Sequence, residues 1–129
     1  MKIVIDTNVY ISALVFNKKV QEILEIILEQ HTVYISPFII EEIKEKLKIK
    51  FKFDLEAINL LVTALLLITK LEEPKGELPT KSKDTDDNNI LLLAEFIKAD
   101  LIISGDKDLF KLISFKNIRI LKPADFFEH

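Results

Sequence analysis

Two short stretches, KIVIDTN at residues 2–8 and LIISGDKD at residues 101–108, decide how this chain is expected to fold. Each contains a continuous apolar run that is followed by a polar turn with an aspartate. Short apolar runs of this kind are typical of strands buried on both faces. Segments with helical spacing of apolar residues lie between them, so the sequence predicts an α/β fold with a parallel sheet covered by helices on both faces.

The rest of the chain follows the same alternation of strands and helices. We expect strands at 2–6, 32–36, around Leu71, at 101–104 and at 118–121. We expect helices at 9–16, 20–30, 37–48, 54–67 and 86–98, a short helix from Asp106, a helical turn at 123–127 and a loop at 75–82. A chain of 129 residues has about the length of one ordinary domain, so we expect a single domain over residues 1–129.

The composition excludes several classes of protein. A hydrophobic share of 49% is enough for a packed core, and a net charge of −3 is unlike a protein that holds duplex DNA by bulk electrostatics. The chain has no cysteine, hence no disulfide or thiol nucleophile, and its two glycines cannot build a glycine-rich phosphate loop. The apolar runs are too short to span a membrane, so we expect a soluble, cytoplasmic protein without a membrane partner.

Acidic side chains follow two of the predicted strands at the edge where an open parallel sheet binds ligands. Asp6 ends the first strand, and Asp106 follows the strand at 101–104, with Asp108 shortly after it. An aspartate at such a junction is often only the cap of the next helix. Thr7 and Asn8 could cap the first helix equally well, so capping alone does not require Asp6.

The helix at 37–48 contributes a third acidic residue. Its apolar face contains Ile39, and Glu42 lies about 60° from Ile39 around the helix, at the border of that face. Glu41 and Glu45 point toward solvent in the same projection. Of the three acids on this helix, Glu42 is therefore the one directed toward the sheet, although a boundary residue with a solvated head would have the same position.

A fourth acidic segment, DTDD at residues 84–87, precedes the apolar helix at 86–98. Aspartates at a helix start are stabilised by the helix dipole, which accounts for one or two of them. Asp87 shares a face with Leu91, and Asp86 shares a face with Leu93. Because both neighbours are apolar, periodicity alone does not choose between Asp86 and Asp87.

Acids from these four segments would converge on one cleft. Carboxylates that close repel each other, which raises their pKa values and costs stability. The single arginine, Arg119, offers little neutralisation, so a divalent cation is the natural partner. Ligands that are all oxygen favour Mg²⁺ or Mn²⁺ over zinc, and such a cluster suits phosphodiester hydrolysis by metal-activated water.

Four motifs of this chain resemble those of the PIN-domain family of metal-dependent ribonucleases, in the branch that contains the toxins of toxin–antitoxin pairs. They occur in the family's order between residues 2 and 110. The family often has a proline where this chain has Thr85. The motifs are DTNV at 6–9, SP at 36–37 followed by Glu42, DTDD at 84–87, and SGDKDL at 104–109.

The resemblance implies a three-layer α/β/α sandwich and RNA cleavage by water without a covalent intermediate. It also implies inhibition by an antitoxin protein and assembly into homodimers. The catalytic, metal-binding acids that it implies are Asp6, Glu42, Asp87 and Asp106, with Asp108 as an accessory ligand and with Asn8 and Ser104 as supporting polar residues.

Other functions fit parts of the sequence. A non-catalytic module that binds RNA or protein would keep the same fold. A phosphoacceptor receiver domain would need an acid next to Asp6, where Thr7 stands, and an aspartate at the end of a middle strand, whereas Asp54 opens a helix. A dehalogenase-type phosphatase would need a second aspartate at the position of Asn8.

The stretch KEKLKIKFKF at residues 44–53 alternates lysine with apolar residues after Glu45. Such a pattern suits a surface that follows an RNA backbone, with Phe51 or Phe53 available for base stacking. The preferred interpretation is a lysine-bearing helix end whose aromatic residues belong to the core.

Overall fold

The protein is described by a computed structural model that covers residues 1–80, 85–110, 112 and 114–128. The strands are β1 (Lys2–Ile5), β2 (Thr32–Ile35), β3 (Lys70–Leu71), β4 (Leu101–Ile103), β5 (Ser114–Phe115) and β6 (Ile118–Leu121). The α-helices are α1 (Thr7–Ile11), α2 (Lys18–Gln30), α3 (Pro37–Ile49), α4 (Leu55–Ile68), α5 (Thr85–Ile97) and α6 (Lys107–Phe110). Two other helical turns are the π-helical η1 (Ser12–Phe16) and the 3-10 helix η2 (Pro123–Glu128).

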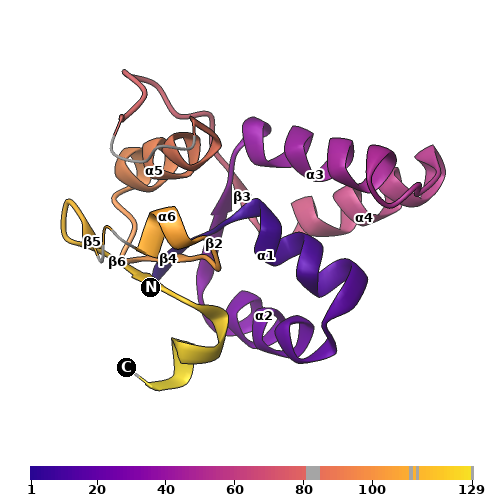
Figure 1. The fold of residues 1–129 in the computed structure, drawn as a ribbon, viewed down its shortest axis with the longest axis horizontal. Helices are drawn as coiled ribbons and strands as arrows, with labels where there is room; N and C mark the ends of the chain where they lie inside the picture. The colour runs from indigo at the N-terminus through magenta and orange to yellow at the C-terminus, as the bar shows by residue number, and fades with distance from the viewer. Residues whose placement is uncertain (81–84, 111, 113, 129) are drawn as a thin grey trace.

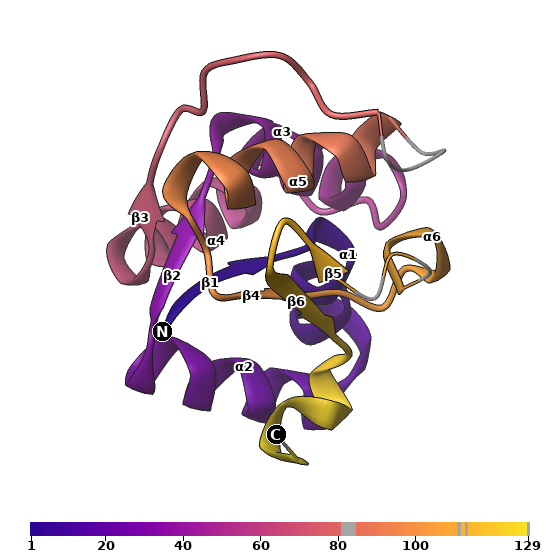
Figure 2. The same cartoon turned by 90° about the vertical axis from the view of Figure 1, so that its left-hand side faces the viewer.

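The strands form one sheet in the order β3-β2-β1-β4-β6-β5. The pairs from β3 to β6 are all parallel, and β5 is paired antiparallel with β6 at the edge. Figure 1 shows the helices arranged around this sheet, with α3 and α4 adjacent. In Figure 2, α5 lies on one side of the sheet and α2 on the other. The predicted three-layer α/β/α sandwich with a central parallel sheet is therefore confirmed.

Two helix starts on one side of the sheet have the caps that the sequence indicates. The Ile39 backbone N–H donates to Ser36 Oγ at 3.3 Å, with Pro37 as the first residue of α3. The Ala57 N–H donates to Asp54 Oδ1 at 2.8 Å, which makes Asp54 the cap of α4. These side chains satisfy backbone donors that a helix start leaves without a partner. Asp54 therefore opens a helix, unlike the strand-end aspartate of a receiver domain.

Two local elements differ from the prediction. The helix expected at 9–16 is α1 continued by the π-helical η1, where the Asn17 N–H donates to the Ser12 carbonyl at 2.8 Å. Apolar spacing does not distinguish a single π-turn from an α-turn. The strand β5 was not expected; it forms a hairpin with β6 through Lys116 and Asn117, whose φ values are 49° and 69°. Positive φ at both central residues fits a type I′ turn, and Asn117 is the residue that could have indicated it.

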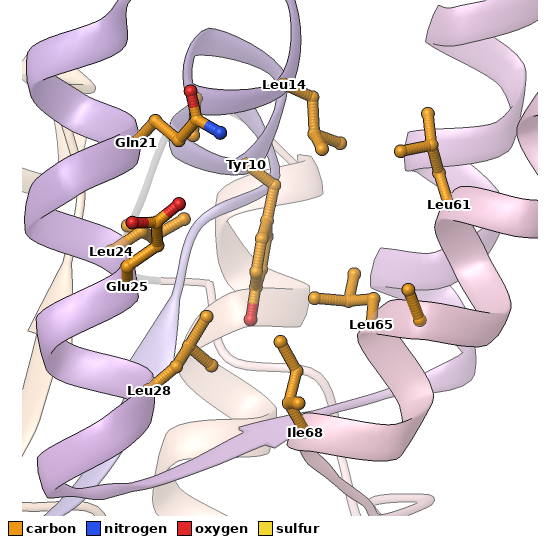
Figure 3. Close-up of a pocket in the computed structure, with 11 residues that line it drawn as sticks. Tyr10, Leu14, Gln21, Leu24, Glu25, Leu28, Leu61, Leu65 and Ile68 are labelled. Carbon is orange, nitrogen blue, oxygen red and sulfur yellow. The ribbon is translucent and has the colours of Figure 1, made fainter.

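An apolar cavity of about 170 Å³ lies between α1, α2 and α4 (Figure 3). Tyr10 stands in its centre, and its hydroxyl is directed between Leu28 and Ile68. That hydroxyl is buried and has no hydrogen-bond partner within the described part of the chain. Burial raises the pKa of Tyr10 far above its ordinary value. None of the acids singled out by the sequence lines this cavity, which makes it distinct from the acidic edge of the sheet.

The outer face of α4 is apolar and exposed. Leu55, Leu60 and Leu67 are 70%, 67% and 81% exposed, whereas Ile58 and Val62 on the opposite face are buried. Among the described residues, no helix is both long enough and apolar enough to cross a membrane. The three exposed leucines form an apolar patch on the outer surface of α4.

Candidate metal centre

The centre of the acidic site is built on the adjacent parallel strands β1 and β4. Asp6 follows β1, and its backbone N–H donates to the Ile103 carbonyl at 2.9 Å. Ser104 follows β4, and its hydroxyl donates to Asp6 Oδ2 at 2.8 Å. The Ser104 N–H is itself fixed by the Leu121 carbonyl of β6 at 2.9 Å. Both strand ends thus deliver their polar residues to one edge of the sheet, as the sequence predicts.

The Asp6 side chain does not cap α1. The residue has the backbone conformation of an N-cap, yet its carboxylate accepts no capping hydrogen bond. Only 5% of Asp6 is exposed, and burial together with the nearby Asp106 raises its pKa, although Ser104, Lys46 and Thr7 act in the opposite direction. A buried carboxylate that contributes no cap points to a role in binding.

The turn after β4 gives Asp106 two neighbours of different kinds. The Asp106 N–H donates to Ser104 Oγ at 3.0 Å, which links it to the Asp6 side chain. Its Oδ1 accepts from the Asp108 N–H at 2.7 Å, so Asp106 caps the short helix α6. This is the helix-end hydrogen bond that the simpler interpretation of Asp106 predicts. The bond also holds Asp106 and Asp108 in a fixed relation to each other.

Asp87, Asp106 and Asp108 form a compact group of carboxylates. One carboxylate oxygen from each lies within 4.8 Å of the others. Asp87, in the first turn of α5, is buried, and Asp106 and Asp108 are half-buried. Oxygens that share one Mg²⁺ at about 2.1 Å are roughly 3–4 Å apart, so a small contraction of this group would enclose an ion. The donor set and its spacing fit a hard divalent cation.

Glu42, on α3, contacts Thr7 and the carboxyl group of Asp86. Its Oε1 accepts from the Thr7 hydroxyl at 2.6 Å. Burial is the main reason that the pKa of Glu42 is raised to about 6; the Thr7 hydrogen bond opposes this, and the neighbouring Asp86 carboxyl adds to it. Glu42 is half-buried whereas Glu41 and Glu45 are exposed, which confirms the helical projection.

The predicted acids thus fall into two neighbouring groups. Asp87 lies with Asp106 and Asp108, and Glu42 lies with Asp86. Asp6 is joined to the first group through Ser104 and through its interaction with Asp106. In Figure 2, α1, α6 and the first turn of α5 lie toward the same end of the sheet. Asp84, the first acid of the motif at 84–87, lies outside the described residues.

The structure adds three residues that the sequence did not assign to the site. Thr7 holds Glu42, and Asp86 contacts Glu42 while Asp87 turns toward Asp106. Lys46 donates to Asn8 Oδ1 at 2.7 Å, and its charge opposes the rise in pKa of Glu42 and of Asp6. Lys46 comes one helical turn after Glu42, and this spacing is the signal that could have found it.

The basic stretch at 44–53 is divided between core and surface. Phe51 and Phe53 pack against the hydrophobic core, and Phe51 forms an edge-to-face contact with Phe16 at a centroid distance of 5.0 Å. Lys44 forms an ion pair with Glu41 at 3.4 Å. The aromatic residues therefore belong to the core, as the preferred interpretation has it, while Lys46 reaches the acidic site.

An open hollow of about 490 Å³ borders Asp106. It lies between the start of α1 and the turn after β4, so a ligand in the hollow would lie against Asp106. Its lining residues are Asn8, Val9, Ser12, Val20, Gly105, Asp106, Lys107 and Pro123.

Comparison with known structures identifies the fold. The chain resembles VapBC2 from Rickettsia felis, solved bound to a DNA fragment from its promoter, with a TM-score of 0.66, 16% identity, and coverage of 93% of this chain and 97% of the other. It also resembles VapC20 from Mycobacterium tuberculosis, a sarcin–ricin loop cleaving toxin, with a TM-score of 0.62, 14% identity, and coverage of 91% and 98%. At these identities the likeness is one of fold.

The sequence comparisons establish the family. Uncharacterized protein MJ1680 from Methanocaldococcus jannaschii is 34% identical over an aligned length of 143 residues. The alignment covers 99% of this chain and 90% of that protein. The model of the PIN domain matches residues 2–108. This match includes every acid of the two groups described above, and the chain belongs to the PIN domain family.

Proposed function

We propose that the protein is a metal-dependent endoribonuclease that hydrolyses phosphodiester bonds of RNA. The observation that carries the proposal is the group formed by Asp87, Asp106 and Asp108, which is next to the buried Asp6 and of which Asp106 lines a large hollow. Membership of the PIN domain family and a fold shared with a sarcin–ricin loop cleaving toxin support RNA as the substrate class. We take residues 1–129 as one nuclease domain.

We propose Mg²⁺ or Mn²⁺ as the cofactor because the donors that converge here are all carboxylates. Asp87, Asp106 and Asp108 would hold the ion, with Asp6 beside them. When bound, such an ion activates water and stabilises negative charge on the leaving oxygen. Ser104 keeps the Asp6 carboxylate directed toward Asp106, and Asp106 keeps Asp108 in place through its backbone N–H.

Glu42 is suited to handle a proton in this reaction. Its pKa of about 6 lies close to neutral pH, where a general base changes its protonation state most readily. Thr7 fixes Glu42 Oε1. Asn8 lines the hollow, and we assign it a supporting role as a polar residue that faces the substrate.

We further propose that the protein is the toxin of a toxin–antitoxin pair and acts in the cytoplasm, where its RNA substrate occurs. The fold shared with VapBC2 and VapC20 supports an antitoxin protein as the partner. The apolar patch of α4, with Leu55, Leu60 and Leu67 exposed, supports a homodimer because such side chains gain by being covered.

The alternative is a PIN-like module that binds RNA or protein without cleaving it. One observation favours it: Asp106 is engaged in capping α6, and Glu42 is engaged by Thr7, so both acids also have structural roles. The two functions differ in whether the acidic group binds a metal ion and supports turnover.

The deciding experiment is cleavage of single-stranded RNA by the purified protein in Mn²⁺, with the variant Asp87→Asn and the matched surface control Asp125→Asn. We expect cleavage by the wild type and the control, and loss of cleavage in EDTA and in Asp87→Asn. Cleavage that persists in EDTA or in Asp87→Asn would reject the metal mechanism. RNA binding without cleavage and without Mn²⁺ binding would establish the non-catalytic alternative.

A further inference from the structure

Lys46 connects α3 to the start of α1 at the border of the acidic site. Its ammonium donates to Asn8 Oδ1 at 2.7 Å. It follows Glu42 by one turn of α3, so both side chains project from the same face of the helix. Its positive charge opposes the rise in pKa that burial causes at Asp6 and at Glu42.

Asn8, which accepts the hydrogen bond from Lys46, lines the hollow. Asp106 and Lys107 line the same hollow. The neighbouring lysines of α3 are placed differently: Lys44 is paired with Glu41, and Lys48 is exposed on another part of the helix surface. Lys46 is thus the lysine of α3 whose ammonium is held by a residue that lines the hollow.

In a nuclease with this charge distribution, the carboxylates of the site repel the phosphates of the RNA. The chain carries a net charge of −3, and six carboxylates gather at the sheet edge, namely Asp6, Glu42, Asp86, Asp87, Asp106 and Asp108. An RNA backbone that enters the hollow brings further negative charge; the divalent ion offsets part of the repulsion, and a fixed cation beside the acids would offset more of it. A lysine ammonium is a compact point charge that binds phosphate.

We propose that Lys46, held by Asn8, binds a backbone phosphate of the RNA next to the acidic group and that its charge weakens binding of the divalent ion there. The inference rests on the proposed nuclease function. It makes Lys46 a substrate-binding residue whose removal has opposite effects on two ligands, because the same charge attracts phosphate and repels a metal cation.

The test compares Lys46→Met, which keeps the apolar stem, with the matched control Lys48→Met. We expect Lys46→Met to raise the KM for single-stranded RNA roughly three- to tenfold and to change kcat less than about twofold. The slope of log KM against log salt should become shallower by about 0.7, the value for one phosphate contact with a single strand. By calorimetry, Mn²⁺ should bind the metal-free acidic group of this variant roughly two- to fivefold more tightly than that of the wild type. Lys48→Met should leave all of these unchanged.

Two further variants exclude a purely structural effect. Lys46→Arg should restore the wild-type KM and Mn²⁺ affinity because it keeps the charge. Asn8→Ala should raise KM less than Lys46→Met, because the ammonium remains but loses its anchor. Thermal unfolding of each variant checks that it is folded at the assay temperature, and Lys46→Gln replaces Lys46→Met should the latter unfold.

Three results would overturn the inference. Equal KM and Mn²⁺ affinity in Lys46→Met and Lys48→Met would remove Lys46 from the substrate site while the nuclease function stands. A fall in kcat at constant KM would place Lys46 in the chemical step instead of in phosphate binding. A wild-type protein that neither binds Mn²⁺ nor cleaves RNA would overturn both the proposed function and this inference.

Discussion

The hydroxyl of Ser104 donates to Asp6 Oδ2 at 2.8 Å, and the same hydroxyl accepts from the Asp106 backbone N–H at 3.0 Å. One side chain therefore fixes two acids that follow neighbouring parallel strands. The arrangement places the Asp6 carboxylate, whose burial raises its pKa, within the influence of Asp106. In the protein without metal, this proximity costs stability, and the hydrogen bond from Ser104 limits that cost.

Loss of the Ser104 hydroxyl should therefore destabilise the protein. Ser104→Ala leaves the buried Asp6 carboxylate without this donor, and we expect the free energy of unfolding at pH 7 to fall by about 1–2 kcal/mol in urea denaturation. In Asp6→Asn, which has no charge to satisfy, the same change should cost less. A double-mutant cycle that gives no coupling between the two positions would contradict this account.

Bound divalent ions should stabilise the protein through the acidic group. Mn²⁺ at about 100 times its dissociation constant should add roughly 2.7 kcal/mol to the free energy of unfolding, because an ion that binds the folded state shifts the equilibrium. The melting temperature should rise with Mn²⁺ and return to its initial value in EDTA. The rise should be absent in Asp87→Asn and present in Asp125→Asn; an equal rise in both variants would place the ion elsewhere.

Glu42 should give the metal-free protein a specific dependence of stability on pH. Its pKa is raised from 4.5 to about 6, so the folded state retains the proton over a range in which the unfolded chain has lost it. Below pH 4.5 both states are protonated and no penalty arises; between 4.5 and 6 stability falls as pH rises, and above 6 the penalty is complete. Because Glu42 is half-exposed, solvent screening limits the penalty to roughly 1 kcal/mol.

The variants Glu42→Gln and Glu41→Gln test this assignment as a matched pair. We expect Glu42→Gln to be more stable than wild type at pH 7 in EDTA and to show a flatter stability profile between pH 4.5 and 6. Glu41, one position earlier and exposed, should have no such effect. The same profile in Glu42→Gln and wild type would show that another group titrates in this window.

The order of the elements and the acidic edge could be predicted because both depend on local sequence. Apolar runs locate β1 and β4, and the residue after a parallel strand is delivered to a known edge, which placed Asp6 and Asp106 before any tertiary contact was known. Glu42 follows from the helical projection of α3. These positions needed only the period of a helix and the direction of a strand.

The remaining features depend on how elements pack together. Asp86 and Asp87 both occupy the first turn of an apolar helix, and only the approach of α3 and α6 to α5 directs Asp86 to Glu42 and Asp87 to Asp106. The contact between Lys46 and Asn8 depends in the same way on the packing of α1 against α3. Periodicity describes one helix at a time and carries no information about such contacts.

Tyr10 offers a test that is independent of the acidic site. Its hydroxyl is buried in the apolar cavity without a partner in the described residues, and a buried donor of this kind costs about 1–3 kcal/mol. Tyr10→Phe removes the hydroxyl and keeps the ring that fills the space between α2 and α4, so the variant should be more stable than wild type by about 1 kcal/mol in urea denaturation.

The control is Tyr34→Phe on β2, where the side chain is half-buried and the change should be close to neutral. RNA cleavage should be the same in all three proteins, because Tyr10 lines a cavity that contains none of the acids of the candidate metal centre. A loss of stability in Tyr10→Phe would mean that the hydroxyl is hydrogen-bonded in solution, with water as the partner best able to reach it.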